Sequence, residues 1–208
     1  ILDGPYSNSA FDIVCKNDKV YMIIGGKDLL NGKRFDKGGY ILTYDYDKWS
    51  FIDPKEAQKK LNLPRNPRDY TSIAVTTDDS NDEIVYASSM GDGVIQYKNG
   101  TPVQSYNEKN AFKETAGGYG SGYCYIDGLA FDKNGNLWMT SSEVNHAVLV
   151  LDKAGAWHRL DIEQLRGVYT INDILITSTN DKWIYVPRNT PKLVMIPNSE
   201  SLDEVSSY

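Results

Sequence analysis

Short apolar segments alternate with polar turns along the whole chain. One set of apolar segments begins at Ile13, Ile73, Leu129 and Ile174, and each runs into a turn rich in Asp, Asn, Ser or Lys. A second apolar segment follows each turn, and a third follows after a further loop. Short apolar runs bounded by turn residues are typical of β-strands, so the pattern predicts an all-β chain. The second segments are 20–23, 84–86, 137–139 and 183–186, and the third are 40–42, 94–97, 147–150 and 193–196.

A fourth apolar segment completes three of these units, at 49–51, 103–106 and 157–160, whereas the last unit ends in the polar tail 198–208. The units recur at intervals of roughly 45–60 residues, and a four-stranded propeller blade takes roughly 40–50. We therefore predict that residues 1–208 form a single β-propeller segment of four consecutive four-stranded blades, the last incomplete, within a larger ring. The expected blades are approximately 10–52, 71–106, 126–160 and 171–197.

The connections between segments differ in length in a regular way. Strand direction alternates along a blade, so the connections inside a hairpin and those between hairpins fall at opposite ends. All the long connections belong to the second kind, and we expect them to form one elaborated face. Only 54–63 has a helical pattern, which Pro64 would end. The long connections are 25–39, 53–70, 107–125 and 161–169.

The long connections hold the candidate ligand-binding residues. Basic side chains, including Lys27, suit an anionic glycan or an acidic protein patch, or are simply solvated. Tyrosines among the glycines of 117–125 suit a sugar platform or a packed plug over the central channel. His146 lies at the end of the loop 141–145. Its imidazole could act as a general base, which is an alternative to a role in ligand binding. The candidates are Arg34, Arg65, Arg68, Tyr119, Tyr123, Glu143 and His146.

The net charge, the lengths of the apolar runs and the two cysteines exclude some kinds of protein. The net charge is −6 and the basic residues are scattered, so nucleic-acid binding is not expected. No apolar run approaches the roughly 18 residues of a membrane span. Cys15 and Cys124 could form a disulfide only with Cα atoms within about 7 Å, and we expect two buried small apolar side chains instead. The chain begins at Ile1 without Met, so we expect a boundary left by processing or cloning.

Common catalytic patterns fit the sequence poorly. It has no G-x-S-x-G motif, and the glycine-rich run 117–122 precedes no predicted helix that could bind phosphate. His158 lies in a predicted outer strand. The segment 132–136 reads better as a hairpin turn than as a calcium loop. We therefore predict a protein that is not an enzyme and needs no cofactor.

One enzymatic alternative rests on a resemblance. Tyr125–Ala130 followed by Gly135–Trp138 resembles the blade motif of gluconolactonase-like six-bladed propellers, in which acidic and Asn side chains from several blades hold a divalent metal. That resemblance carries over to Asp127 and to Asn172 or Asp173. Asp12 and Ser72 at the equivalent positions leave the set incomplete. It thus implies, as an alternative, a metal-dependent hydrolase with Asp127 and Asp173 as weak metal candidates.

Two further resemblances point to bacterial envelope proteins. Gly128–Met139 resembles the blade consensus of two-component-regulator propellers, the periplasmic sensor regions of hybrid histidine kinases in Bacteroidetes-type bacteria. The succession of segments resembles the first propeller of PorZ-type proteins over nearly the whole chain. The segments that carry it are 4–8, 20–26, 39–45, 87–94 and 128–143.

The PorZ-type resemblance implies a non-enzymatic, outer-membrane-associated accessory protein of type IX secretion, built of two propellers and a small β-domain. Such proteins take part in handling an anionic lipopolysaccharide that becomes attached to secreted cargo. We therefore expect an extracytoplasmic recognition and scaffolding propeller with a protein or surface glycan as partner. The alternative is a periplasmic sensor domain. Because an incomplete ring exposes sheet edges, we also expect the chain to self-associate.

Overall fold

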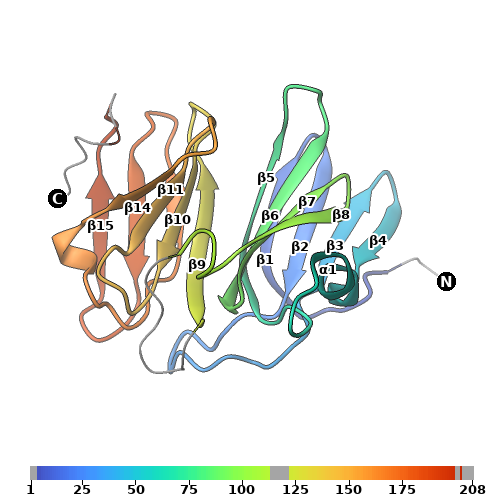
Figure 1. Ribbon diagram of the computed structural model, residues 1–208, viewed down its shortest axis with the longest axis horizontal. Coiled ribbons are helices and arrows are strands. Elements are labelled where there is room, and N and C mark those ends of the chain that lie inside the picture. Colours follow the sequence, from blue (N-terminus) through green and yellow to red (C-terminus); the bar gives the residue numbers. More distant parts are fainter. Residues whose placement is uncertain (1–3, 113–121, 200–201, 203–208) are drawn as a thin grey trace.

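The computed structural model describes residues 4–112, 122–199 and 202, and these residues form almost only antiparallel strands (Figure 1). The predicted all-β class is confirmed. The strands are β1 (Ala10–Lys16), β2 (Lys19–Ile24), β3 (Ile41–Asp45), β4 (Lys48–Ile52), β5 (Tyr70–Thr77), β6 (Glu83–Gly91), β7 (Gly93–Lys98), β8 (Thr101–Tyr106), β9 (Cys124–Phe131), β10 (Leu137–Ser141), β11 (Val148–Leu151), β12 (Trp157–Leu160), β13 (Ile174–Ile176), β14 (Lys182–Val186) and β15 (Lys192–Ile196).

Consecutive strands pair antiparallel, so the chain folds as a series of units. We call β1–β4 unit 1, β5–β8 unit 2, β9–β12 unit 3 and β13–β15 unit 4. Units 2 and 3 also join edge to edge through a short pairing of β6 with β9, where Met90 faces Tyr125. In the described part of the chain, unit 4 has three strands. The order of the strands therefore matches the prediction. The sheets differ from four separate blades, because units 2 and 3 belong to one eight-stranded sheet.

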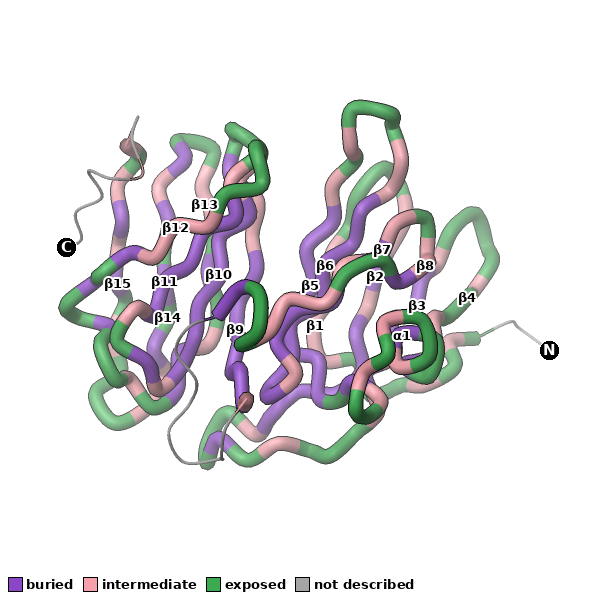
Figure 2. Tube along the Cα trace, viewed as in Figure 1, coloured by how far each residue is buried: buried purple, intermediate pink, exposed green. Residues whose placement is uncertain are grey.

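The buried apolar residues form three layers between successive units and one small cluster of Met90, Tyr123 and Tyr125. Figure 2 shows the buried stretches of the strands in purple. Residues alternate between the two faces of each strand, so a unit between two others buries both faces. Tyr21 and Ile23 of unit 1 pack against Ile73 and Val85 of unit 2 in one such layer. The outer faces of units 1 and 4 keep exposed apolar side chains.

The innermost strands contact one another in succession. The Asp12 carboxylate accepts from the Ile73 amide at 3.2 Å, and the Ser72 hydroxyl accepts from the Leu129 amide at 3.2 Å. A Cβ on Gly128 would lie 2.6 Å from the Ile174 amide nitrogen, so only glycine allows this approach. Strands β1, β5, β9 and β13 thus follow one another side by side.

The short helix expected at 54–63 is present as α1 (Pro54–Leu61). The Asp53 carboxylate accepts from the Lys55 amide at 2.9 Å, and Pro54 fits the first turn, which needs no amide donor. The helix ends before Pro64, because Asn62 adopts a left-handed conformation with φ of 51°. A 3-10 turn, η1 (Glu163–Leu165), lies in the connection from β12 to β13.

The long connections meet at one end of the strands. The Gly39 amide donates to the Pro67 carbonyl at 3.0 Å, which joins the β2–β3 loop to the β4–β5 connection. The Met90 amide donates to the Asp69 carbonyl at 3.0 Å, which brings the β6–β7 turn next to the β4–β5 connection. These contacts agree with the prediction of one elaborated end. Among the described residues, no helix is both long and apolar enough to cross a membrane.

The expectation for the cysteines is half wrong. Both thiols are free, and Cys124 is buried, but Cys15 is exposed. Cys15 lies on the outer face of unit 1, and no other unit covers that face. Burial, followed by the nearby Glu108 carboxylate, raises the pKa of Cys124 to about 12. Neither cysteine therefore indicates an oxidising compartment.

Candidate functional site

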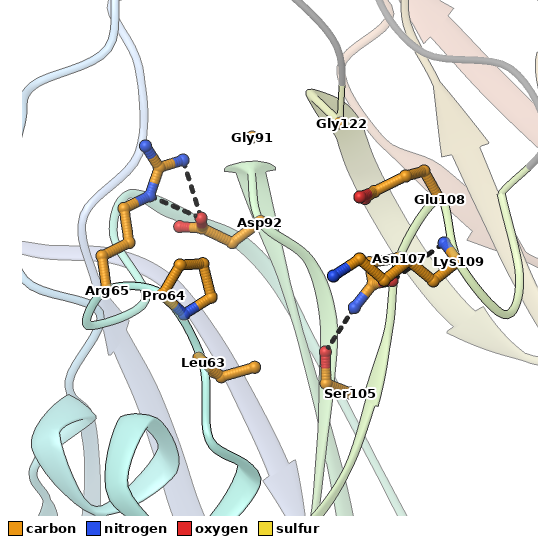
Figure 3. Close-up of a pocket in the computed structure, with 10 residues that line it drawn as sticks. All are labelled: Leu63, Pro64, Arg65, Gly91, Asp92, Ser105, Asn107, Glu108, Lys109 and Gly122. Atoms are coloured by element: carbon orange, nitrogen blue, oxygen red, sulfur yellow. Dashed lines mark hydrogen bonds and ion pairs between the residues drawn. The ribbon is translucent and has the colours of Figure 1, made fainter.

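A hollow of about 310 Å³ opens at the elaborated end, between the connection that follows α1 and the connection that follows β8 (Figure 3). Arg65, one of the predicted residues, lies on one side, and the turn between β6 and β7 forms the back. The lining residues are Leu63, Pro64, Arg65, Gly91, Asp92, Ser105, Asn107, Glu108, Lys109 and Gly122.

Asp92 is presented by a very tight turn between β6 and β7. Gly91 and Gly93 have φ values of 127° and 78°, and a Cβ on Gly93 would lie 2.1 Å from the Tyr106 carbonyl oxygen. One carboxylate oxygen of Asp92 contacts Arg65 Nε at 2.8 Å and Nη2 at 2.7 Å. The other oxygen accepts from the Arg68 amide at 3.1 Å. This fixes the guanidinium of Arg65 at the rim, where its side chain is 49% exposed.

A capped turn after β8 forms the opposite wall. Asn107 accepts from the Lys109 amide and donates to the Ser105 hydroxyl, each at 3.0 Å. Glu108 lies across the hollow from Asp92 in Figure 3, and its carboxylate is 4.0 Å from the Cys124 sulfur. The wall therefore presents a carboxylate, an ammonium group and a side-chain amide.

A second hollow of about 320 Å³ extends this site toward the C-terminal end of α1. It shares Leu63, Pro64, Ser105, Asn107 and Lys109 with the first and adds Leu61, Asn62, Gln104 and Asn110. We call the two hollows together the α1–β8 groove. The groove places hydrogen-bond donors and acceptors beside the aliphatic surface of Leu63 and Pro64. This combination suits a ligand rich in hydroxyl groups.

Arg34 and Arg68 lie beside the groove. Arg34 Nε is 2.8 Å from an Asp36 carboxylate oxygen, and Arg68 Nη1 is 3.8 Å from the same oxygen. Arg34 lines a further hollow of about 270 Å³ with Gly32, Lys33, Asp36 and Met90. Asp36 and Asp92 thus bring the three predicted arginines into one region.

The predicted tyrosines do not form an exposed platform in the described part of the chain. Tyr123 is 8% exposed and packs with Met90 and Tyr125. Burial raises the pKa of Tyr123 to about 12. The packed-plug interpretation suits this residue better than the sugar platform does, while Tyr119 lies outside the described residues.

Glu143 and His146 occupy a different place, the connection between β10 and β11. The Glu143 amide donates to the Val168 carbonyl at 2.8 Å, and the backbone of Glu143 is left-handed, with φ of 63°. His146 is half-buried in the same connection. Neither residue lines the α1–β8 groove, so the predicted set divides into two groups.

Lys27 and Asp127 form a buried ion pair, which sequence reasoning missed. Lys27 was expected on an exposed basic loop, but its side chain is 1% exposed and that of Asp127 is 0% exposed. The Lys27 ammonium also donates to the Ile171 carbonyl at 2.9 Å, and the Ser142 hydroxyl donates to Asp127. Burial raises the pKa of Asp127 to about 6, even though Lys27 opposes that shift. We call this arrangement the Lys27 clamp.

The second weak metal candidate, Asp173, accepts from the Ile174 amide at 2.8 Å. It lines a cavity of about 120 Å³ with Asp12 and Asn172, among others, and burial raises its pKa. The Asp127 carboxylate is already paired with the Lys27 ammonium. Within the ranges that the structure describes, no three His, Cys, Asp or Glu side chains gather in a way that could hold a metal ion.

Sequence reasoning also missed Asp92 and Glu108, which shape the α1–β8 groove. Asp92 stands between two glycines just before the predicted strand 94–97, and this signals a tight turn that displays a carboxylate. Glu108 gave no such signal, because it is one of several polar residues in a long connection.

Comparison with known proteins shows the fold. No protein family model and no curated protein matches this chain. The structure of PorZ, an essential surface component of the type IX secretion system of Porphyromonas gingivalis, matches with a TM-score of 0.83 at 19% identity, over 99% of this chain and 28% of PorZ.

Extracellular domains of B. thetaiotaomicron regulators match less closely. That of BT3049, named as a hybrid two-component system, gives a TM-score of 0.53 at 16% identity over 98% of this chain and 28% of its own. That of BT4673, named as a one-component system, gives 0.59 at 16% identity over 96% and 24%. The chain thus spans about a quarter of each of these proteins. At these identities the likeness shows a propeller-type fold, shared with surface or extracellular domains.

Proposed function

We propose that this chain is a non-catalytic, extracytoplasmic recognition and scaffolding module, PorZ-like, with four consecutive blades of a larger propeller. Its role would be accessory to type IX protein secretion and to the handling of surface glycans. The likeness to PorZ over 99% of the chain supports the envelope location. The observation that carries the proposal is the α1–β8 groove, which the long connections build at one end.

A glycan suits the groove for a chemical reason. Sugar hydroxyls donate and accept hydrogen bonds, and the groove offers acceptors at Asp92 and Glu108 and donors at Arg65 and Lys109. Arg65 is held by Asp92 before any ligand arrives, so little conformational entropy is lost on binding. An anionic sugar would gain a charge-assisted contact with the exposed guanidinium.

The test is a titration of the purified chain with two soluble bacterial polysaccharides, one anionic and one neutral, followed by calorimetry. We expect binding of the anionic one, and Arg65→Ala should weaken it about tenfold or more, because a hydrogen bond to a charged group contributes about 1.5–3 kcal/mol.

Arg166→Ala is the matched control, since Arg166 is also 49% exposed and also pairs with an aspartate, Asp161, away from the groove. Equal effects of the two substitutions, or no binding by the unaltered chain, would contradict the proposed site.

A second candidate function is a periplasmic sensor domain of a hybrid two-component histidine kinase. The similarity to the extracellular domain of BT3049 favours it, at a lower TM-score than PorZ. The downstream part of the full-length gene separates the two. A membrane span and a kinase would favour the sensor, and a second propeller would favour the secretion accessory.

A further inference from the structure

A hollow of about 560 Å³ lies between units 2 and 3, at the end of the strands opposite the α1–β8 groove. The turns that follow β5, β9 and β11 contribute to its walls. Its volume falls within the roughly 300–1,000 Å³ of small-molecule sites. We call it the unit 2–3 hollow. Both walls come from units inside the chain, so further blades, which would extend the series beyond units 1 and 4, would leave this space as it is.

The way in which units 2 and 3 are joined explains the hollow. At the elaborated end, β6 and β9 are hydrogen-bonded, with Met90 facing Tyr125 and Gly91 facing Cys124. From there the strands of the two units spread apart toward the opposite end (Figure 1). The two units are therefore held together at one end and leave a wedge-shaped space at the other.

The two neighbouring interfaces are closed at this same end by direct contacts. Between units 1 and 2, the Lys19 ammonium is 2.8 Å from the Glu83 carboxylate, and both groups are largely shielded from solvent. Between units 3 and 4, the Lys133 amide donates to the Asn180 side-chain oxygen at 3.0 Å. The open space between units 2 and 3 is thus a property of that interface and not of every interface between units.

The floor of the unit 2–3 hollow is apolar. It is made by Ile84, Tyr86, Leu137 and Leu151 of the apolar layer between the two units, and by Phe131, which packs against that layer. The rings of Tyr86 and Phe131 meet edge to face, with their centres 5.9 Å apart. Such a floor suits a large aliphatic or aromatic side chain, because burial removes apolar surface from water.

The two walls above this floor differ in charge. The unit 2 wall has one more aspartate than lysine, whereas the unit 3 wall has one more lysine than aspartate. The charged lining residues are Asp78, Asp79 and Lys98 of unit 2, and Lys133, Asp152 and Lys153 of unit 3. A ligand with a positive group at one end and a negative group at the other therefore matches both walls at once.

One ion pair spans the mouth of the hollow. Lys153 of unit 3 lies 3.5 Å from Asp79 of unit 2, and the two side chains are 68% and 93% exposed. An ion pair this exposed is weak, because water screens both charges. A ligand that carries an ammonium group and a carboxylate can replace this pair and satisfy both partners.

We propose that the unit 2–3 hollow binds a short peptide that has both ends free and one large apolar side chain. Such a peptide is a zwitterion at neutral pH, since its amino end is protonated and its carboxyl end is ionised. Its ammonium group contacts Asp79, its carboxylate contacts Lys153, and its apolar side chain lies on the floor. This site is separate from the α1–β8 groove and takes a ligand of a different class.

Calorimetric titration of the purified chain with the dipeptide leucyl-phenylalanine tests the proposal. We expect binding, and we expect acetylation of the amino end or amidation of the carboxyl end to raise the dissociation constant at least about fivefold each, because each change removes a charge-assisted contact. Glycylglycine keeps both charges but has no apolar side chain, so its dissociation constant should be at least about tenfold higher.

Two variants assign the ends of the peptide to their partners. Asp79→Asn should weaken binding of leucyl-phenylalanine but not of its acetylated form, and Lys153→Gln should weaken binding of leucyl-phenylalanine but not of its amide. Both positions are highly exposed, so the fold is expected to persist, and circular dichroism verifies it. Lys48→Gln is the matched control, since it alters an exposed lysine of unit 1 outside the hollow.

Three results would overturn the proposal. They are no binding of leucyl-phenylalanine up to roughly 10 mM, equal affinities for the free, acetylated and amidated peptides, and equal losses in the variants of Lys153 and Lys48. None of them bears on the α1–β8 groove, whose test uses polysaccharides and Arg65→Ala.

Discussion

Lys27→Met is expected to lower the free energy of unfolding by about 3–5 kcal/mol at pH 7.5, because it leaves a buried carboxylate without its cation. Asp127 is fully buried, and Lys27 is its ionic partner as well as a donor to the Ile171 carbonyl. Methionine fills a similar volume, so the loss reports charge rather than packing. Urea denaturation followed by fluorescence measures it.

The loss should shrink as the pH falls. In the native protein the pKa of Asp127 is raised from 3.8 to about 6, and removal of Lys27 raises it further, because Lys27 lowers it. Between the unfolded and the folded pKa the native state binds more protons, so the free energy of unfolding decreases as the pH rises. The variant should therefore be closest to the unaltered protein near pH 5 and furthest from it above pH 7.

Two controls isolate the charge pair. Lys27→Met combined with Asp127→Asn should be more stable at pH 7.5 than Lys27→Met alone, since both charges are then gone. Lys33→Met alters an exposed lysine of the same loop and should change stability by less than about 0.5 kcal/mol. If the variants of Lys27 and Lys33 lose equal stability, the Lys27 clamp contributes nothing.

Trp138→Ala is expected to lower the free energy of unfolding by about 3–5 kcal/mol, the usual cost of truncating a buried tryptophan. The indole is 1% exposed, donates to the Asp132 carboxylate at 3.0 Å and packs beneath the Lys182 ammonium. The substitution thus removes the centre of the apolar layer between units 3 and 4. Urea denaturation gives the value.

Trp183→Ala is the matched comparison, because Trp138 and Trp183 occupy equivalent positions on the second strands of units 3 and 4. This substitution should cost no more than about 1 kcal/mol, since Trp183 is 39% exposed. Trp138→Phe should restore most of the packing but not the hydrogen bond to Asp132. Similar losses at positions 138 and 183 would show that the different burial of the two tryptophans does not set their contributions to stability.

The strands could be predicted because their signal is local. The turn at 132–136 is an example: the Asp132 carboxylate accepts from the amides of Asn134 and Asn136, each at 2.9 Å. Asn99 and Gly100 have φ values of 48° and 74°, as a two-residue hairpin turn requires. A few adjacent residues determine such turns, and the same is true of the cap of α1.

The Lys27 clamp could not be predicted, because its partners are far apart in the sequence. Lys27 lies in a polar loop, and nothing near it indicates burial, since Asp127 is 100 residues away. Cys15 was misjudged for a related reason. Its strand was assigned correctly, but its exposure depends on whether another unit covers that face, and no pattern within the strand reports this.

The Lys27 clamp affects how the molecule unfolds. Repeat proteins with neighbour-only contacts can unravel from an end, one repeat at a time. Here the β2–β3 loop passes beneath β9 in Figure 1 and reaches the Ile171 carbonyl, 144 residues further along. The loop of unit 1 cannot then separate from the rest without breaking this contact with β9 and with the connection before β13. Denaturation is expected to be all-or-none, and folding to be slow, because that contact is among the most non-local in the chain.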